Sequence, residues 1–148
     1  MSYIYSGYQY ADPNAVDMFG VIPMRMSSFC FLFVSFIAYN KHNIFACMIM
    51  IFNFITSVNL HKNVKKFDKS QIALKIDHLA ILSWIMLNCY LLLYGTVSRE
   101  NKYKSVLCAL YTFVLSRYRS KFQFRDLCRD AIHCSMHLMG SVGTIIIL

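Results

Sequence analysis

Two histidines at the start of the last apolar run of this sequence, His133 and His137, could share one chemical task. They are four residues apart, and positions i and i+4 lie one above the other on the same face of an α-helix. Imidazole is the commonest metal ligand in proteins, so the pair could hold a metal ion. The same spacing would also suit two histidines that lie near lipid headgroups, and a third ligand would have to come from elsewhere in the chain.

Other polar residues with catalytic potential lie at the edges of two earlier apolar runs. Ser57 and His61 are also four residues apart, and Asp77 and His78 are adjacent. Three neutral imidazoles with an open fourth position form a catalytic zinc arrangement, in which zinc lowers the pKa of a bound water to about 7. Asp77 could orient that water and take its proton, and Ser57 could polarise a substrate carbonyl. The simpler alternatives are that Asp77 favours the start of its helix and that Ser57 bonds to its own helix.

The composition favours a membrane protein. Of the 148 residues, 57% are hydrophobic and only 15% are charged, whereas soluble domains carry roughly 25% charged residues. The formal net charge of +8 would suit nucleic acid. However, the basic residues lie in short segments between apolar runs, where they set membrane topology and meet anionic lipid headgroups. We therefore predict a protein whose partner is membrane lipid and which does not bind nucleic acid.

Five apolar runs predict an all-α, polytopic bundle of about five transmembrane helices. Residues 1–25 would form an N-terminal interfacial arm and residues 26–148 the transmembrane helical domain. The predicted spans are Met26–Tyr39, Ile44–Leu60, Ile76–Thr96, Tyr103–Tyr118 and Asp126–Leu148. The predicted connections are a tight turn at 40–43, a basic loop at 61–75, a polar loop at 99–104 and a second basic loop at 117–130.

This arrangement brings the polar candidates to one depth in the membrane. The N-terminal arm and both basic loops would lie on one side, which collects most of the Lys and Arg residues and is therefore cytoplasmic by the positive-inside rule. All six polar candidates then lie within about two turns of the cytoplasmic ends of three helices: Ser57, His61, Asp77, His78, His133 and His137. Ionisable groups within spans usually face the bundle interior and mark a site.

Three motifs occur in order along the chain: S-x-x-x-H at Ser57–His61, IDHLAI at residues 76–81 and HCSMHLMGS at residues 133–141. This trio resembles the CREST superfamily of membrane hydrolases, which includes alkaline ceramidases, the progestin and adipoQ receptors and hemolysin III proteins. The resemblance covers residues 57–84 and 130–143. It implies that His61, His133 and His137 bind zinc and that Ser57 and Asp77 are polar catalytic partners. Members typically have seven spans, whereas this chain has room for five.

The sequence thus predicts an integral, multi-pass membrane protein that resembles a zinc-dependent hydrolase of a lipid amide or ester. The alternative is a small non-catalytic multispanning protein, such as an accessory subunit of a membrane complex, a channel-forming protein or a viral membrane protein. Either could have membrane-protein partners or form a homo-oligomer. A zinc site would require imidazole nitrogens of His61, His133 and His137 to converge within about 4 Å, because Zn–N bonds are near 2.0–2.1 Å. His78 adjoins Asp77 and points elsewhere on its helix, so we assign it no ligand role.

Overall fold

A bundle of antiparallel helices makes up the part of the chain that the structure describes. The structure is a computed structural model, and it describes residues 25–63, 67–119 and 127–148. The helices are α3 (Phe29–Asn40), α4 (Ile44–Asn63), α5 (Phe67–Tyr94), α6 (Arg99–Arg119) and α7 (Leu127–Ile147). The predicted all-α class is confirmed. The predicted N-terminal arm lies outside the described residues except for Arg25, as do residues 64–66 and 120–126 of the two predicted basic loops.

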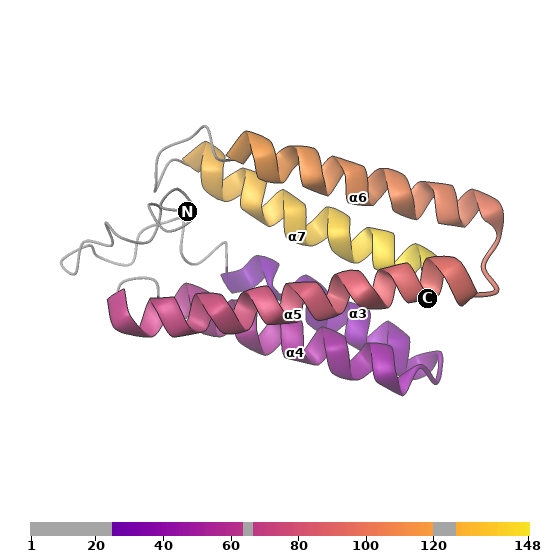
Figure 1. The fold of residues 1–148 in the computed structure, drawn as a ribbon, viewed down its shortest axis with the longest axis horizontal. Helices are drawn as coiled ribbons and strands as arrows, with labels where there is room; N and C mark the ends of the chain where they lie inside the picture. Colours follow the sequence, from indigo (N-terminus) through magenta and orange to yellow (C-terminus); the bar gives the residue numbers. More distant parts are fainter. Residues whose placement is uncertain (1–24, 64–66, 120–126) are drawn as a thin grey trace.

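The helices form two groups. α4 packs between α3 and α5, and α6 and α7 pair with each other as a hairpin beside that group. α7 joins the groups because it also packs on α3 and, less extensively, on α5. Since consecutive helices run in opposite directions, α4 and α6 end where α3, α5 and α7 begin (Figure 1). We call this the histidine end of the bundle, because His61, His133 and His137 all lie there.

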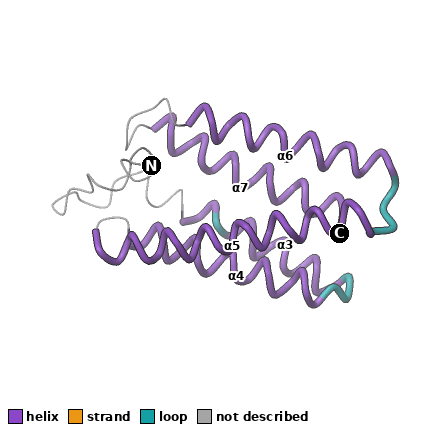
Figure 2. The backbone as a smooth tube through the Cα atoms, in the orientation of Figure 1, coloured by secondary structure: helices purple, strands orange, loops and turns teal. Residues whose placement is uncertain are grey.

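The first turn is as short as predicted. α3 ends at Asn40 and α4 begins at Ile44, and Figure 2 shows the short loop between them. His42 takes a left-handed conformation with φ of 58°, which reverses the chain after α3. The Asn43 side-chain oxygen accepts a hydrogen bond of 3.0 Å from the Ala46 N–H, so Asn43 caps the start of α4.

The predicted polar loops at 61–75 and 99–104 are wrong in their extent. α4 continues to Asn63, α5 already begins at Phe67, and α6 begins at Arg99. Lys, Arg, Glu and Gln are good helix formers, so a run of charge does not end a helix. With 28 residues, α5 rises about 42 Å, whereas a hydrocarbon core is about 30 Å thick. The charged residues at 67–75 thus extend the helix beyond its apolar segment.

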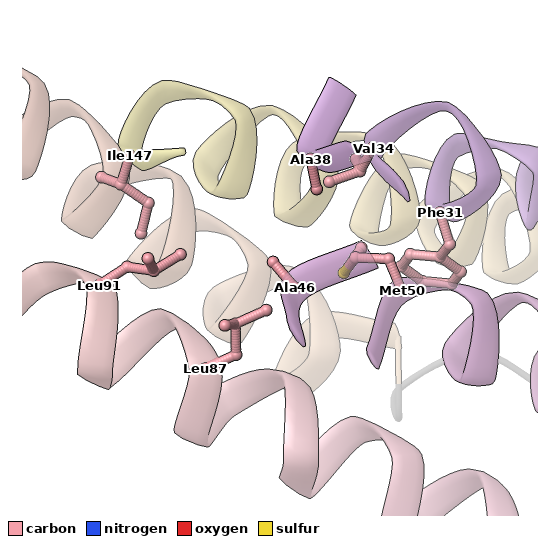
Figure 3. Packing of buried hydrophobic residues seen from close by; sticks show 8 residues of the cluster. All are labelled: Phe31, Val34, Ala38, Ala46, Met50, Leu87, Leu91 and Ile147. Atoms are coloured by element: carbon pink, nitrogen blue, oxygen red, sulfur yellow. The ribbon is translucent and has the colours of Figure 1, made fainter. Parts of the chain in front are cut away.

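The largest apolar cluster joins four of the helices. Figure 3 shows its buried members, which are Phe31, Val34, Ala38, Ala46, Met50, Leu87, Leu91 and Ile147. It begins next to the histidine end, where the ring centroid of Phe31 lies 4.9 Å from that of His137. It extends to the contact of α5 with the end of α7 (Figure 3). The core therefore holds the end of α7 against α5, while Phe31 of α3 contacts α7 beside the histidines.

Glycines let α7 approach its neighbours closely. A Cβ at Gly140 would lie 2.1 Å from Cη2 of Trp84, and one at Gly143 would lie 3.0 Å from Cβ of Cys108. The indole of Trp84 donates a hydrogen bond of 2.8 Å to the Thr144 hydroxyl. Because glycine has no side chain, α5 and α6 can each pack closely on α7, as helices do at small residues.

Two helices are long and apolar enough to cross a membrane. Their segments Ile44–His61 and Ile72–Tyr94 are only 39% and 22% buried, and Ala131–Ile147 forms a shorter apolar helix. The core helix of a soluble protein would be mostly buried. Here large apolar side chains such as Phe45 and Leu93 are 65% and 71% exposed. An apolar exterior of this kind is typical of a surface that meets a membrane or another protein.

Candidate metal centre

The three predicted ligands come together at the histidine end. One ligand nitrogen of each of His61, His133 and His137 lies within 4.8 Å of the other two. His61 comes from the end of α4, and the other two come from the first turns of α7. His61 is only 2% exposed. This group of imidazoles could hold a metal ion.

The distances suit a tetrahedral metal after a small adjustment. Bonds of 2.0–2.1 Å at tetrahedral angles separate two ligand nitrogens by about 3.3 Å. Nε2 of His61 and Nε2 of His133 are 3.3 Å apart, so this pair already has the required spacing. The full set, within 4.8 Å, is wider than the expected separation of about 4 Å. His137, whose ring centroid lies 5.9 Å from that of His61, would have to move inward on binding.

His137 is oriented by a residue that precedes α3. The Ser27 hydroxyl lies 2.9 Å from Nδ1 of His137. In the tautomer with hydrogen on Nδ1, that N–H donates to the Ser27 oxygen and leaves the Nε2 lone pair for a metal. Metal-binding histidines usually have such a partner on the second nitrogen, which fixes the ring orientation and the tautomer. The Ser27 contact therefore fits a ligand role for His137.

His133 has a different partner, the guanidinium of Arg119 at the end of α6. Nη1 of Arg119 hydrogen bonds to Nδ1 of His133. A guanidinium can only donate, so Nδ1 accepts and the hydrogen of the neutral ring lies on Nε2, which faces His61. A metal on Nε2 would require the hydrogen to lie on Nδ1. Metal binding there therefore requires Arg119 to release the ring.

The two predicted catalytic partners are buried at the same end. Ser57 is 3% exposed and Asp77 is 9% exposed, so neither lies on the outer surface of the bundle. The Ser57 hydroxyl lies 2.8 Å from that of Ser28. Asp77 accepts a hydrogen bond of 3.2 Å from the hydroxyl of Thr56. Ser57 and His61 lie on one face of the last turns of α4. Thr56, in the same turns, holds the Asp77 carboxylate through its hydroxyl.

Sequence reasoning missed three residues of this site: Ser27, Ser28 and Arg119. The two serines are a polar pair inside the first apolar run, and that exception to the pattern could have marked them. Arg119 carried no comparable signal, because a basic residue at the end of a span is explained equally well by topology. His78 is exposed, and we continue to assign it no ligand role.

No family model, curated protein or solved structure matches this chain. The resemblance to the CREST superfamily therefore remains a prediction from three short motifs. Any function proposed for this chain rests on the geometry of the histidine end.

Proposed function

We propose that this chain is a multi-pass membrane protein whose three histidines bind zinc and whose site hydrolyses a lipid amide or ester. The observation that carries the proposal is the convergence of His61, His133 and His137 inside a bundle with an apolar exterior. Basic residues gather at the histidine end, so we propose that this end is cytoplasmic.

The ligand set supports zinc and a hydrolytic reaction. Three imidazoles leave one coordination position open, as in catalytic rather than structural zinc sites. When bound, zinc would act as a Lewis acid that polarises a carbonyl and activates water. Since the site lies inside a bundle whose exterior is apolar, its natural electrophile is the carbonyl of a lipid amide or ester that enters from the bilayer.

The surrounding side chains have the chemistry that such a reaction needs. Asp77 can accept a proton from water, and its hydrogen bond from Thr56 positions the carboxylate. The hydroxyls of Ser57 and Ser28 are joined by a hydrogen bond of 2.8 Å at this end of the bundle, and a hydroxyl there could donate to a substrate carbonyl. Ser27 orients His137. Acid–base and orienting groups thus lie at the same end of the bundle as the ligand set.

Metal analysis of the detergent-purified protein tests the proposal. We expect about one zinc per chain, lost in the His133→Ala/His137→Ala double variant. His78→Ala is the matched control, because His78 is an exposed histidine at the same end of the bundle and should not affect the zinc content. A monodisperse, helical preparation that has met no chelator and contains no metal would refute the proposal. Retained zinc with no hydrolysis of any lipid amide or ester would favour the non-catalytic alternative.

A further inference from the structure

Exposed tyrosines gather at the end of the bundle opposite the histidine end. α3 and α5 end there and α6 begins there (Figure 1). Within about one turn of these helix ends lie Tyr39, Tyr90, Tyr94 and Tyr103. Tyr39 is 61% exposed, Tyr94 is 73% exposed and Tyr103 is 70% exposed. The ring centroids of Tyr90 and Tyr94 are 5.3 Å apart. We call these four residues the tyrosine group.

The tyrosine group separates apolar surface from charge on α3 and α5. On α3, Phe36 is 61% exposed one turn before Tyr39, and the exposed Lys41 follows directly after the helix. On α5, Leu93 in the last turn is 71% exposed. The first charged residue after that helix is the exposed Arg99. On both helices the surface therefore changes from apolar side chains to tyrosine and then to charge.

α6 has the same order in reverse, because it begins at this end. Glu100 lies in its first turn, Tyr103 follows, and Leu107 is 64% exposed one turn further along. Lys104 adjoins Tyr103, but its Nζ reaches back to lie 2.6 Å from Oε1 of Glu100. Long basic side chains extend in this way from an apolar surface toward water. The charge therefore stays on the outer side of Tyr103.

This order is typical of the boundary between acyl chains and lipid headgroups. Tyrosine is enriched there because its ring is apolar and its hydroxyl can reach water. Another protein covering this surface would not require the same order at the same end of three helices. Among the other tyrosines in the described residues, Tyr118 lies in the last turn of α6 and only Tyr111 lies between the two ends.

The length of α5 fits one bilayer measured from the tyrosine group. The exposed Lys75 precedes Tyr94 by 19 residues, which correspond to a rise of about 28 Å. The hydrocarbon core of a typical bilayer is about 30 Å thick. Trp84 precedes Tyr94 by 10 residues, or about 15 Å. Trp84 is therefore half-way between the two levels.

We infer that the tyrosine group lies at the headgroup boundary of one membrane leaflet and that Trp84 lies near the middle of the bilayer. α6 then crosses the membrane, although its composition alone does not identify it as a span. The inference rests on the membrane location in the proposed function and requires neither the metal nor the reaction.

Quenching of tryptophan fluorescence by brominated lipids tests this placement. The full chain is reconstituted at low protein density in phosphatidylcholine vesicles that carry bromine either near the carbonyl end or near the methyl end of the acyl chains. Trp84 is the one tryptophan of the chain, so the wild-type protein needs no label. Its emission should be quenched at least twofold more by the deep bromines near the methyl ends. Stronger quenching by the shallow bromines would overturn the placement.

Two variants in a Trp84→Phe background measure the depth of the tyrosine group on α6. Tyr103→Trp and Phe113→Trp are a matched pair, because the original side chains are 70% and 63% exposed and lie about 15 Å apart along one helix. Tyr103→Trp should be quenched at least twofold more by the shallow bromines, and Phe113→Trp by the deep ones. Equal depth profiles would overturn the inference, since α6 would then lie along the membrane surface. A Tyr103→Trp protein that neither lipid quenches would also overturn it, because protein would then cover the tyrosines.

Extraction of the vesicles with alkaline carbonate separates these outcomes from a failure of the proposed function. A chain that carbonate releases and that neither lipid quenches would refute the membrane location itself. A chain that stays in the vesicles with the wrong order of depths would refute this inference alone, and the zinc analysis would still test the metal centre.

Discussion

Replacing Gly140 with alanine should disturb both the packing of α7 and the metal centre. The new Cβ would lie 2.1 Å from Cη2 and 2.7 Å from Cζ2 of Trp84. Ordinary carbon contacts are about 3.5–4.0 Å, so the indole must move away by roughly 1.5 Å. That movement would break the hydrogen bond of 2.8 Å between Trp84 and Thr144.

The expected loss of stability is roughly 2 kcal/mol, from three contributions. Overpacking costs about 1–3 kcal/mol, and the lost hydrogen bond costs about 0.5–1.5 kcal/mol. The higher helix propensity of alanine returns up to about 1 kcal/mol. The disturbance should also reach His137, because the Phe31 ring centroid lies 5.6 Å from that of Trp84 and 4.9 Å from that of His137. Zinc affinity should therefore fall as well.

Unfolding in a titration with dodecyl sulfate, followed by far-ultraviolet circular dichroism, measures this loss. Trp84 is the one tryptophan of the chain, so the emission maximum of Gly140→Ala reports directly on the indole. A double-variant cycle with Trp84→Phe supplies the control, since the phenyl ring lacks the outer indole atoms that clash. Gly140→Ala should cost much less in that background. Equal costs in the two backgrounds, or unchanged stability and emission in the single variant, would refute the reasoning.

Three further changes test other parts of the site and the surface. Ser27→Ala removes the partner of His137 and should weaken zinc binding by about ten- to a hundredfold. Competition with a chelator measures this change in zinc affinity. An undiminished zinc affinity would exclude an orienting role for Ser27. Asp77→Asn should lower turnover of a lipid substrate about 10²–10⁴-fold while the zinc content stays unchanged, and turnover within a few-fold of wild type would exclude a role in proton transfer. The hydrogen bond from Lys104 holds the pKa of Glu100 below its usual range, so any stability from this pair is present at neutral pH and lost as the pH falls through that lowered pKa. Because the pair is exposed, Glu100→Gln should leave the unfolding curve unchanged at pH 7 and at pH 4; a clear loss confined to pH 7 would show that the pair matters.

The convergence of the three histidines at one end of the bundle could be predicted, because it depends only on helix geometry and on the direction of each helix. The spacing of His133 and His137 places both on one face of α7. Alternation of antiparallel helices then brings the end of α4, with His61, to the same end of the bundle. Neither step requires knowledge of how the helices pack, and for this reason the convergence was accessible from the sequence.

The contacts between helices could not be predicted in the same way. Ser27 reaches His137 across 110 positions of sequence, and its role depends on the distance and rotation of α3 relative to α7. That rotation is set by the apolar cluster around Phe31 and Met50, whose members cannot be told from the exposed apolar residues in the sequence. The extent of α5 was misjudged for a different reason. Charge marks where a helix leaves the apolar region, and Lys69 and Lys75 before Ile76 are part of α5.

A metal ion held by the three histidines would have a structural consequence that follows from the arrangement of the helices. α4 packs on α3 and α5, and α7 packs mainly on α6, so the side chains of His61, His133 and His137 are a direct link from α4 to the α6–α7 hairpin. Without a metal, this link consists of close imidazole contacts and one hydrogen bond of 3.3 Å between His61 and His133. A metal would replace it with three coordinate bonds, and metal binding energy contributes directly to folding. The ligands should therefore hold the hairpin to the rest of the bundle, so a chelator should loosen the contact of α7 with α3 even in a protein that has no substrate bound.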